Sequence, residues 1–432
     1  MTTFALTADS FANRTIRKLQ WRLIPYLFLL YVISFIDRAN IGFAALTMNK
    51  ELGITSEQFG WVAGVFFFGY VLSGIPSNLM LHKSGARIWI ALILVVWGAI
   101  ALMMGLVHSV RELYALRFLL GFAEGGYFPG VALYLTYWFR QREQAQCIAL
   151  FLTGVPVSNI IGGPLSGWIL DHVHWMQLAS WRWLLVLEAL PAIVLGIATY
   201  FVLPSRPEHA DFLSENERDW LQGELKREEH AKREAKAIGT LQALRIPRVW
   251  HSGLLVFSSN IGIYMLTFWM PQLVKSRAGN ISNSKIGLLV MIPYVVGLVT
   301  MVLVSRSSDK RFERRLHAAI PAALAGTALA ILGSPHSLAL TIGLLSVAAA
   351  GMVSIYGPAY SLPSELLAGP AVAAGLGLAS SIANSAGAVG PYAAGWISQR
   401  TGSLYGGLSA AGISLFVCAT LALLLPKKLR RV

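Results

Sequence analysis

Charged residues are scarce in this chain. They make up 13% of the 432 residues, whereas soluble domains average about 25%, so a typical water-soluble enzyme is excluded. The charges are also unbalanced, with 35 Lys and Arg against 21 Asp and Glu. In a soluble chain this excess would suggest nucleic-acid binding, but a mean hydropathy of +0.59 leaves too little polar surface for that partner. The sequence therefore predicts that the positive charge serves membrane topology.

Cysteines and recognisable catalytic motifs are lacking as well. Cys147 and Cys418 are the only cysteines, both in apolar stretches, which excludes the disulfide framework of a small secreted protein. The chain contains no G-x-S-x-G, H-E-x-x-H or G-x-x-x-x-G-K-S motif. His172 and His174 lie close together, but no cysteine or convincing third ligand accompanies them. We therefore expect no enzyme, no ATP-driven pump, no metal and no bound cofactor.

Long apolar stretches dominate what is present. About 20 apolar residues are needed to cross ~30 Å of hydrocarbon as a helix, and about twelve stretches come near this length. Forty glycines are spread through them, which favours close helix contacts within lipid. The sequence therefore predicts an all-α polytopic membrane protein with twelve transmembrane helices. The expected spans are 21–46, 59–81, 88–107, 113–139, 145–170, 183–203, 249–274, 286–304, 316–332, 338–360, 372–397 and 404–425.

The basic residues predict the orientation in the membrane. With both termini on the cytoplasmic side, 26 Lys and Arg fall inside, 7 fall outside, and Arg38 and Arg117 lie within spans, which accounts for all 35. Cytoplasmic loops carry this excess in membrane proteins. The basic start followed by a long apolar run has no convincing cleavage site, so it predicts an uncleaved first span rather than a signal peptide. We expect a multi-pass protein of the bacterial inner membrane, probably-sized for a monomer rather than an obligate assembly.

One hydrophilic stretch divides the apolar chain. Residues 205–248 hold nine acidic and nine basic residues, which is typical of a solvated helical linker rather than a binding site. The predicted organisation is an N-terminal cytoplasmic segment, a six-helix bundle, a cytoplasmic linker, a second six-helix bundle and a cytoplasmic tail. Their boundaries are 1–20, 21–203, 204–248, 249–425 and 426–432.

The two bundles carry signs of duplication. His82 begins a basic loop after the second span, and Asp309 begins a similar loop after the eighth. Gly163-Pro164 in the fifth span corresponds to Gly390-Pro391 in the eleventh. Both pairs are separated by 227 residues, since 309 − 82 and 390 − 163 give the same offset. The sequence therefore predicts two six-helix pseudo-repeats, as in transporters whose halves move about a central site.

With these features the chain resembles the major facilitator superfamily over nearly its whole length. The loops that hold Gly85 and Arg87, and Asp309 and Arg314, resemble the signature gating loops of that superfamily, although His82 and Ala86 depart from its usual choices. Within it, longer motifs are similar to the anion:cation symporter family, whose members import organic carboxylates such as tartrate, hexonates, hydroxyphenylacetate or phthalate, commonly with protons. These motifs lie at 35–44, 75–78, 85–87 and 117–130.

Four charged residues fall inside predicted spans. They are Asp37, Arg38, Arg117 and Glu124, and a charge near the bilayer centre costs roughly 2.5 to 3.5 kcal/mol. We therefore expect them to face the bundle interior. Arg117 and Glu124 share one helical stripe, with Gly121 between them to admit another backbone. Asp37 and Arg38 are adjacent, about 100° apart on a helix, so one faces the cavity and the other a neighbouring helix.

These four residues support two interpretations. They could form a buried ion network that only fixes packing. However, adding 227 to their numbers reaches Tyr264, Met265, Leu344 and Gly351, which are all uncharged, so the second half builds the same scaffold without charges. Our hypothesis is that the two arginines hold a substrate carboxylate, while the two acids take up and release protons. Sodium as the coupling ion is left open.

Further substrate contacts are predicted from both halves. The family resemblance implies that Tyr70, Ser361 and Asn384 lie in the central cavity, and Tyr264 and Gln272 of the seventh span are additional candidates. The resulting functional prediction is import of a small organic anion by proton symport through alternating access. A drug/proton antiporter is the nearest alternative, because Gly163-Pro164 with Gly167 partly resembles its motif. A non-transporting membrane sensor is a third.

Overall fold

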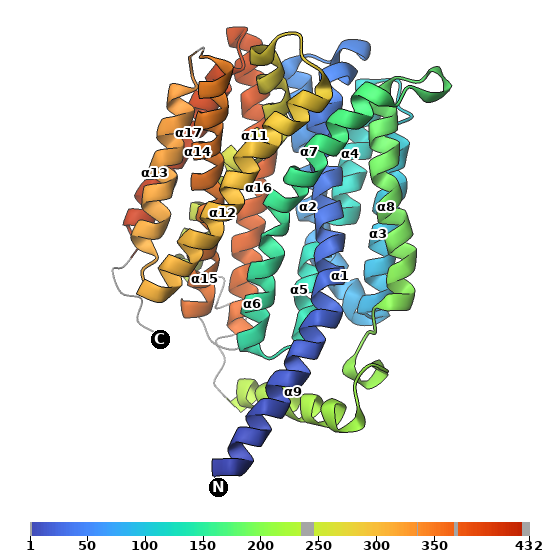
Figure 1. Cartoon of the computed structure of the whole chain (residues 1–432), viewed down its shortest axis with the longest axis vertical. Coiled ribbons are helices and arrows are strands. Elements are labelled where there is room, and N and C mark those ends of the chain that lie inside the picture. The colour runs from blue at the N-terminus through green and yellow to red at the C-terminus, as the bar shows by residue number, and fades with distance from the viewer. Residues whose placement is uncertain (1, 235–245, 335, 367–369, 426–432) are drawn as a thin grey trace.

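The computed structural model describes residues 2–234, 246–334, 336–366 and 370–425. Throughout these ranges the regular elements are helices, which stand side by side as an elongated bundle (Figure 1). Polar caps start several of them. Thr55, Ser109, Ser282 and Ser337 each accept a hydrogen bond from the backbone N–H three residues later, which satisfies a donor that has no partner within the helix.

The helices of the first half and the linker precede those of the second half along the chain. In the first half and the linker they are α1 (Thr2–Glu51), α2 (Ser56–Ser84), α3 (Ala86–Met104), α4 (Val110–Glu124), α5 (Tyr127–Thr136), α6 (Gln141–Leu152), α7 (Gly154–His172), η1 (Trp175–Gln177), α8 (Ser180–Val202), η2 (Pro207–His209) and α9 (Glu215–Glu234). In the second half they are α11 (Pro247–Ala278), α12 (Asn283–Arg311), α13 (Arg315–Ile331), α14 (Leu338–Ser354), α15 (Tyr356–Leu366), α16 (Pro370–Thr401) and α17 (Tyr405–Leu423).

These helices make twelve spans. Nine helical stretches of the described residues have the length and hydropathy to cross a membrane, and the shorter apolar α13 joins α2 and α16 to complete the set. Three spans consist of two helices each: α4 with α5, α6 with α7, and α14 with α15. The all-α, twelve-span architecture predicted from the sequence is therefore confirmed. The short breaks inside three of its spans are an addition that hydropathy alone does not indicate.

The two halves repeat the same backbone features. Gly85, between α2 and α3, has φ +82° and ψ 151°, a region that is open essentially to glycine alone. Phe312, between α12 and α13, also has a positive φ of 49°. The two positions are 227 residues apart, the offset found in the sequence. The prediction of two pseudo-repeats is thus supported at the level of single backbone angles.

The halves meet mainly at the end of the bundle opposite α9, which we call the far end. There α7 packs against α12 and α2 against α16, while α1 contacts α11. A Cβ added to Gly167 would lie 2.3 Å from the carbonyl oxygen of Asn283, and one on Gly395 would lie 2.4 Å from that of Ser56. Because Ser56 and Asn283 are 227 residues apart, these are the same contact made twice. Glycine is required for such close approach of backbones.

A second pair of contacts lies one turn further toward the middle. A Cβ on Gly287 would lie 2.2 Å from the carbonyl oxygen of Gly163, and one on Gly60 would lie 2.9 Å from that of Pro391. Together with the contacts of Gly167 and Gly395 these form the far-end seal, which joins α7 to α12 and α2 to α16. The seal closes the two halves against each other on that side of the molecule.

Asp171, near the end of α7, adds a polar clamp to the far-end seal. Its carboxylate accepts hydrogen bonds from the backbone N–H of Asn283 at 3.0 Å and of Ser284 at 2.7 Å, and from both of their side chains. These N–H groups begin α12 and lack partners within it, and a helix N-terminus attracts negative charge. Asp171 of the first half therefore caps a helix of the second.

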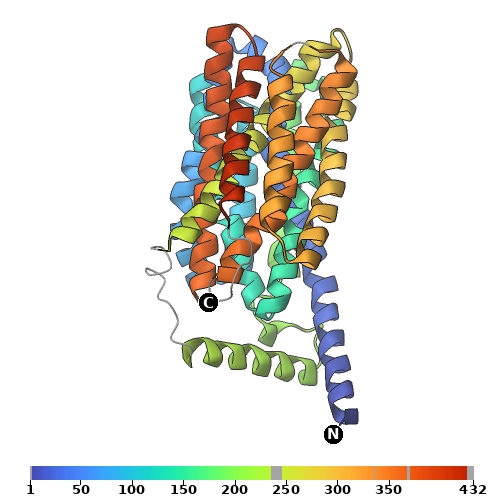
Figure 2. The same ribbon diagram turned by 90° about the vertical axis from the view of Figure 1, so that its left-hand side faces the viewer.

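The linker lies across the α9 end of the bundle, beside the extended start of α1 (Figure 2). Its first part is docked rather than free: the Phe212 ring stacks on Trp138 at 6.2 Å, and the Tyr134 hydroxyl donates to the Pro204 carbonyl at 2.8 Å. Lys18 of α1 forms an ion pair of 2.7 Å with Glu217 of α9. The expectation of a wholly solvated linker is therefore wrong for this part, because apolar side chains anchor it. Residues 235–245 are outside the described part.

Candidate functional site

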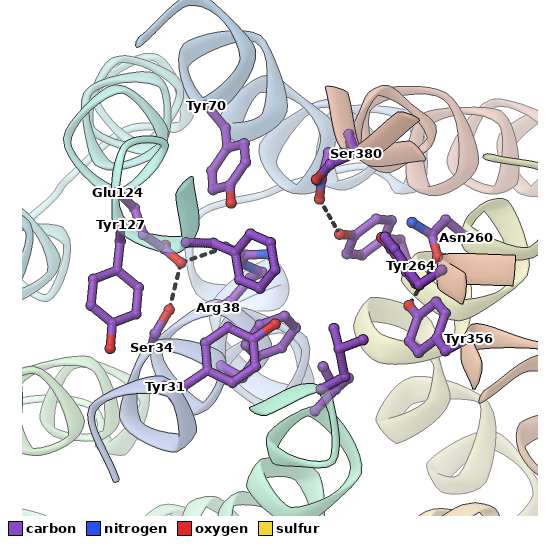
Figure 3. Close-up of a pocket in the computed structure, with 16 residues that line it drawn as sticks. Tyr31, Ser34, Arg38, Tyr70, Glu124, Tyr127, Asn260, Tyr264, Tyr356 and Ser380 are labelled. Carbon is purple, nitrogen blue, oxygen red and sulfur yellow. Dashed lines mark hydrogen bonds and ion pairs between the residues drawn. The ribbon is translucent and has the colours of Figure 1, made fainter. Parts of the chain in front are cut away.

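A pocket lies between the two halves near the middle of the bundle (Figure 3). Its free volume is about 40 Å³, which is enough for a few water molecules but not for a substrate of several carbon atoms. The far-end seal covers one side of it. Its lining comes from both halves: Tyr31, Ser34, Phe35, Arg38, Tyr70, Glu124, Tyr127, Phe128, Leu152, Val155, Asn260, Tyr264, Tyr356, Tyr360, Ser380 and Asn384.

An ion pair between Arg38 of α1 and Glu124 of α4 forms the charged part of the pocket. The Arg38 Nη2 atom donates to the Glu124 Oε1 atom, which also accepts a hydrogen bond of 2.6 Å from the Ser34 hydroxyl. The two charged residues are 3% and 1% exposed. Attraction between opposite charges is strong where water is excluded, but removing either partner leaves the other buried and unpaired. Each group is therefore available only when something replaces its partner.

Glycines on α4 bring Glu124 to this position. A Cβ on Gly121 would lie 1.8 Å from the carbonyl oxygen of Phe66, and one on Gly125 would lie 2.2 Å from that of Tyr70. The backbones of α2 and α4 are thus in direct contact, as the sequence predicted for Gly121. The helix ends at Glu124 and resumes at Tyr127. The carboxyl group therefore projects from a helix terminus at the centre of the membrane.

Aromatic rings surround the Arg38 guanidinium. Its central carbon lies 4.5 Å from the ring centroid of Phe35, 5.0 Å from that of Phe66 and 5.1 Å from that of Tyr70. A ring face attracts a cation, by about 2 kcal/mol or more when the site is desolvated. The rings hold the guanidinium plane in place while its remaining donors stay directed at the pocket. The result is a cation fixed by packing rather than by a second anion.

The second half contributes polar but uncharged groups. The Tyr264 hydroxyl donates to the Asn384 Oδ1 atom at 2.8 Å, and the Tyr356 hydroxyl donates to the Asn260 Oδ1 atom at 2.9 Å. The Asn384 amide in turn donates to the carbonyl of Ser380 at 2.9 Å. Hydroxyl and amide groups both donate and accept hydrogen bonds. This wall can therefore exchange its internal bonds for bonds to the hydroxyl or carboxyl oxygens of a bound molecule.

Asp37 points away from the pocket. Its Oδ2 atom accepts a hydrogen bond of 2.7 Å from the Trp97 indole of α3, and its Oδ1 atom is buried without a partner. Arg38 lines the pocket while Asp37 meets a neighbouring helix, as adjacent positions on α1 require. A role for Asp37 in proton coupling remains a prediction, and it would have to act from behind the pocket.

Arg117 lies outside the pocket lining. Its Nε atom donates to the Val62 carbonyl at 3.1 Å, and its guanidinium packs on the rings of Phe66 and Phe268. Seven residues separate it from Glu124, which is about 10 Å along a helix, so the two cannot face one small pocket. The expectation that Arg38 and Arg117 hold one carboxylate together is therefore not met in this conformation. Both Nη atoms of Arg117 are buried and unpartnered.

The other predicted site residues divide in the same way. Tyr70, Tyr264 and Asn384 line the pocket, whereas Gln272 lies further along α11 and does not. Ser361 belongs to α15, but its side chain is outside the described part. Across the residues that the structure describes, no group of three His, Cys, Asp or Glu side chains could hold a metal ion.

The predicted gating loops lie at the α9 end of the spans. Arg87 follows the Gly85 turn, and its guanidinium lies 5.0 Å from the ring centroid of Tyr200. In the second copy, Asp309 pairs with Arg314, which also donates to the Ser308 hydroxyl at 2.9 Å. Both loops thus hold their charged residues beside the neighbouring spans. Their gating role stays a prediction from the resemblance.

Sequence reasoning missed several pocket residues. Ser34, Asn260 and Ser380 each lie one helical turn before a residue that was predicted, namely Arg38, Tyr264 and Asn384. Residues four apart share a helix face, so this spacing was a usable signal. Glu188 was also missed, although it is a carboxyl group inside the apolar span 183–203 and meets the criterion that singled out the other four charges.

Comparisons with known proteins agree with this architecture. The family profile described as Major Facilitator Superfamily matches residues 27–391. A protein described as a putative tartrate transporter of Agrobacterium vitis is 41% identical over 415 residues, which are 96% of this chain and 95% of the relative. The putative metabolite transport protein NicT of Pseudomonas putida is 38% identical over 95% of this chain and 94% of its own. A quinolone resistance transporter of Acinetobacter baumannii is 35% identical over 97% and 96%.

Solved structures with the same fold are more distant in sequence. A bacterial homologue of the human lysosomal transporter Spinster, in an inward-facing and unoccupied conformation, has a TM-score of 0.76 at 17% identity and covers 96% of both chains. A D-xylose-proton symporter has a TM-score of 0.74 at 15% identity and covers 94% of this chain and 98% of its own. The twelve apolar spans, the repeated halves, the central pocket and these matches lead to one conclusion: this chain is a multi-pass membrane transport protein, not an enzyme, and belongs to the major facilitator superfamily.

Proposed function

We propose that the protein imports a small organic carboxylate together with protons, as members of the anion:cation symporter family do. The observation that carries this proposal is the Arg38 guanidinium in the central pocket, buried, fixed by aromatic rings and paired with the single carboxylate of Glu124. A guanidinium binds carboxylates through two parallel hydrogen bonds. The names of relatives, above all the tartrate transporter at 41% identity, point to the same substrate class.

Proton coupling follows from competition for Arg38. A substrate carboxylate that binds Arg38 displaces Glu124, which then sits buried without a cation. A buried, unpaired carboxylate is strongly disfavoured and takes up a proton. The Ser34 hydroxyl, 2.6 Å from Glu124 Oε1, is positioned to accept that proton in a hydrogen bond. Anion binding and proton binding therefore favour each other, and release of one on the other side favours release of the other.

Alternating access uses the far-end seal. The basic residues assign the α9 end and both termini to the cytoplasm, which makes the sealed far end the outer face. To admit substrate from outside, α7 must separate from α12 and α2 from α16, and Asp171 must release the start of α12. The pocket must also widen, because about 40 Å³ cannot hold a four-carbon acid.

The energetics of import require a coupled cation. Moving one negative charge inward against ~100 mV costs about 2.3 kcal/mol, so an importer that accumulates an anion needs a compensating positive charge. A proton carried by Glu124 supplies it without a dedicated metal site. We place the protein in the bacterial inner membrane, where such a gradient is available.

Efflux of a cationic or neutral drug in exchange for protons is the second candidate. It is favoured by the quinolone resistance transporter that is 35% identical to this chain. Direction of transport in a deletion strain separates the two: import predicts that the gene supports growth on the acid, and efflux predicts resistance to the drug.

Purified protein in liposomes tests the proposal. A panel of tartrate, a hexonate, hydroxyphenylacetate and phthalate is offered with the outside acidic and again without a pH gradient. We expect one class of acid to accumulate only with the gradient. An equal rate in sodium-free and sodium-containing buffer assigns the coupling to protons. Uptake that ignores the pH gradient, or a preference for uncharged amides of the same acids, contradicts the proposal.

A further inference from the structure

A second buried acid site lies in the first half, behind the far-end seal. Glu188 of α8 is 3% exposed, and its Oε1 atom accepts a hydrogen bond of 2.7 Å from the Ser166 hydroxyl of α7. Asn40 of α1 is its other polar neighbour. The Oε2 atom is buried without a partner. Nothing in the transport step at Arg38 makes use of this carboxyl group.

Glu188 differs from Glu124 in lacking a cation. Glu124 is bound to Arg38 and to Ser34, whereas Glu188 makes no ion pair within the described part of the chain. An ionised carboxylate with one hydrogen bond and an unpartnered oxygen in a dry interior is strongly disfavoured. In this conformation Glu188 is therefore in its neutral, protonated form, while Glu124 is ionised.

The neighbours of Glu188 belong to the helices of the far-end seal. Ser166 lies between Gly163 and Gly167, the two glycines of α7 that touch α12. Asn40 lies next to Gly42 of α1, where a Cβ would meet the Phe268 carbonyl of α11 at 2.9 Å. Opening the seal moves α7 and α1 away from α12 and α11. That movement exposes the rear of both helices, and hence Glu188, to water from the far end.

The titratable groups around Glu188 are few. On α1, Asp37 is close enough to interact with it through charge, and Asp37 also senses Glu124. Helix α3 carries no charged residue after Arg87. On α7, Asp171 and His172 lie at the far end, and on α8 Arg182 is held by Glu51 and by two backbone carbonyls. No basic side chain among these pairs with the Glu188 carboxyl group.

We propose that Glu188 is a proton-binding site coupled to the far-end seal: the carboxyl group is protonated when the seal is closed and releases its proton to the outside when the seal opens. The proton that binds is taken from external water, and no other bond is made or broken. Because protonation and closure favour each other, closure also favours protonation by the same factor. Its contribution to coupling rests on the proposed symport, but its effect on the seal does not require a substrate.

The sign of the pH response separates Glu188 from Asp171. Protonating Glu188 favours the buried, closed state, so acid closes the seal. Protonating Asp171 weakens its four hydrogen bonds to α12, so acid would open the seal. The two groups therefore predict opposite effects of external pH, and one measurement of seal opening distinguishes them.

Distances between spin labels on the full-length protein report the state of the seal. Met176, which is 82% exposed in the loop after α7, and Asn280, in the loop before α12, are replaced by cysteine for labelling, with Cys147 and Cys418 changed to serine. The two sites lie on opposite halves. Reconstituted protein is measured without substrate across a range of external pH. A linked single proton changes the open-to-closed ratio by up to about tenfold per pH unit.

We expect the closed population to rise with acidity in the wild-type background. In the Glu188→Gln variant, which mimics the protonated form, the closed population should dominate and lose its pH dependence. Ser166→Ala, which keeps the carboxyl group, should retain the pH dependence with a shifted midpoint. Asp171→Asn should open the seal at all pH values without removing the response.

Two results overturn the assignment. One is a wild-type pH response in Glu188→Gln, and the other is a response that disappears in Glu124→Gln instead. If Glu188→Gln fails to fold, infrared spectroscopy of the wild-type protein and of Glu188→Asp decides. The account predicts a protonated-carboxyl band that persists at neutral pH and shifts in Glu188→Asp, and an unshifted band contradicts it. Failure of carboxylate uptake with an intact seal response would instead reject only the proposed function.

Discussion

The two halves of the molecule share a scaffold but not its chemistry. The first half buries Asp37, Arg38, Arg117, Glu124 and Glu188 inside its spans. Adding 227 gives Tyr264, Met265, Leu344, Gly351 and Leu415 in the second half, none of which is charged. Among the described residues, the second half buries no charged side chain at all. The duplicated unit has therefore become a charged, titratable half facing a neutral, hydrogen-bonding half.

The packing shows what this asymmetry is not needed for. The far-end seal uses the same contact on both sides, Gly167 on Asn283 and Gly395 on Ser56, and both signature loops take a positive φ at the same place. Helix contacts are thus reproduced without buried ions. Charges that cost free energy in a membrane and that the scaffold does not require are best explained by transport.

The largest expected effect comes from removing the charge that defines the first half. Arg38→Ala leaves Glu124 buried and unpaired, which costs about 3 to 5 kcal/mol, and removes the anion-binding group. We expect both exchange and driven uptake to fall at least about 100-fold. Arg38→Lys is the matched control, since it keeps the charge but loses the bidentate geometry, and should retain weak exchange. Normal transport in Arg38→Ala would contradict the site.

Helix packing next to the charged site should be almost as sensitive. Gly121→Ala places a Cβ 1.8 Å from the Phe66 carbonyl, so α2 and α4 must separate and Glu124 must move. We expect a loss of several kcal/mol in stability, roughly 3, read as a lower melting temperature in detergent. Gly343→Ala in α14, which has open space around it, should be neutral or slightly stabilising. Equal melting temperatures for the two variants would contradict the close contact.

Neutralising Glu124 should separate exchange from coupling. Glu124→Gln keeps a hydrogen-bonding side chain beside Ser34 but cannot be ionised or carry a proton. We expect uptake driven by a pH gradient to fall at least about tenfold while counterflow exchange of substrate persists, because the general effect of removing a proton acceptor is about 10²- to 10⁴-fold. Driven uptake that persists undiminished would reject Glu124 as the proton carrier.

The neutral half should respond more weakly. Tyr264→Phe removes the hydroxyl that bonds to Asn384 at 2.8 Å, and one neutral hydrogen bond contributes about 0.5 to 1.5 kcal/mol. We therefore expect a two- to tenfold rise in KM with an unchanged proton dependence, about the factor that this free energy implies. Tyr294→Phe in α12, a buried tyrosine outside the pocket, should leave KM unchanged. A change in proton coupling in Tyr264→Phe would break the division between the halves.

The smallest effect is expected outside the membrane, where the linker docks on the first half. Burial raises the pKa of Glu217, but the hydrogen bond from Lys18 and those from Ser214 outweigh it, so the pKa is lowered overall. A lowered pKa means that the folded state gains stability above the usual glutamate range and loses it as the pH falls below that range. Hydrogen exchange in α9 should therefore increase in acid, and Glu217→Gln should show the increase at neutral pH. Exchange independent of both changes would contradict this anchoring role.

Much of this architecture could be predicted from the sequence, because the cost of exposing polar groups to lipid dominates. Spans, duplication and the interior location of Arg38 and Glu124 all follow from that cost. It does not indicate which neighbour each charge meets: the separation of Arg117 from the pocket and the bond between Asp37 and Trp97 depend on helix rotation and packing. The docking of Phe212 depends on a few apolar side chains in a polar segment, which average composition conceals.

One measurement tests the central claim most directly: proton uptake when a carboxylate binds to purified protein in weakly buffered solution. If the substrate displaces Glu124 from Arg38, binding should remove about one proton from the solution for each carboxylate bound, and the uptake should vanish in Glu124→Gln although binding remains. Binding of the acid by the wild-type protein with no change in proton concentration would contradict the exchange of partners at Arg38.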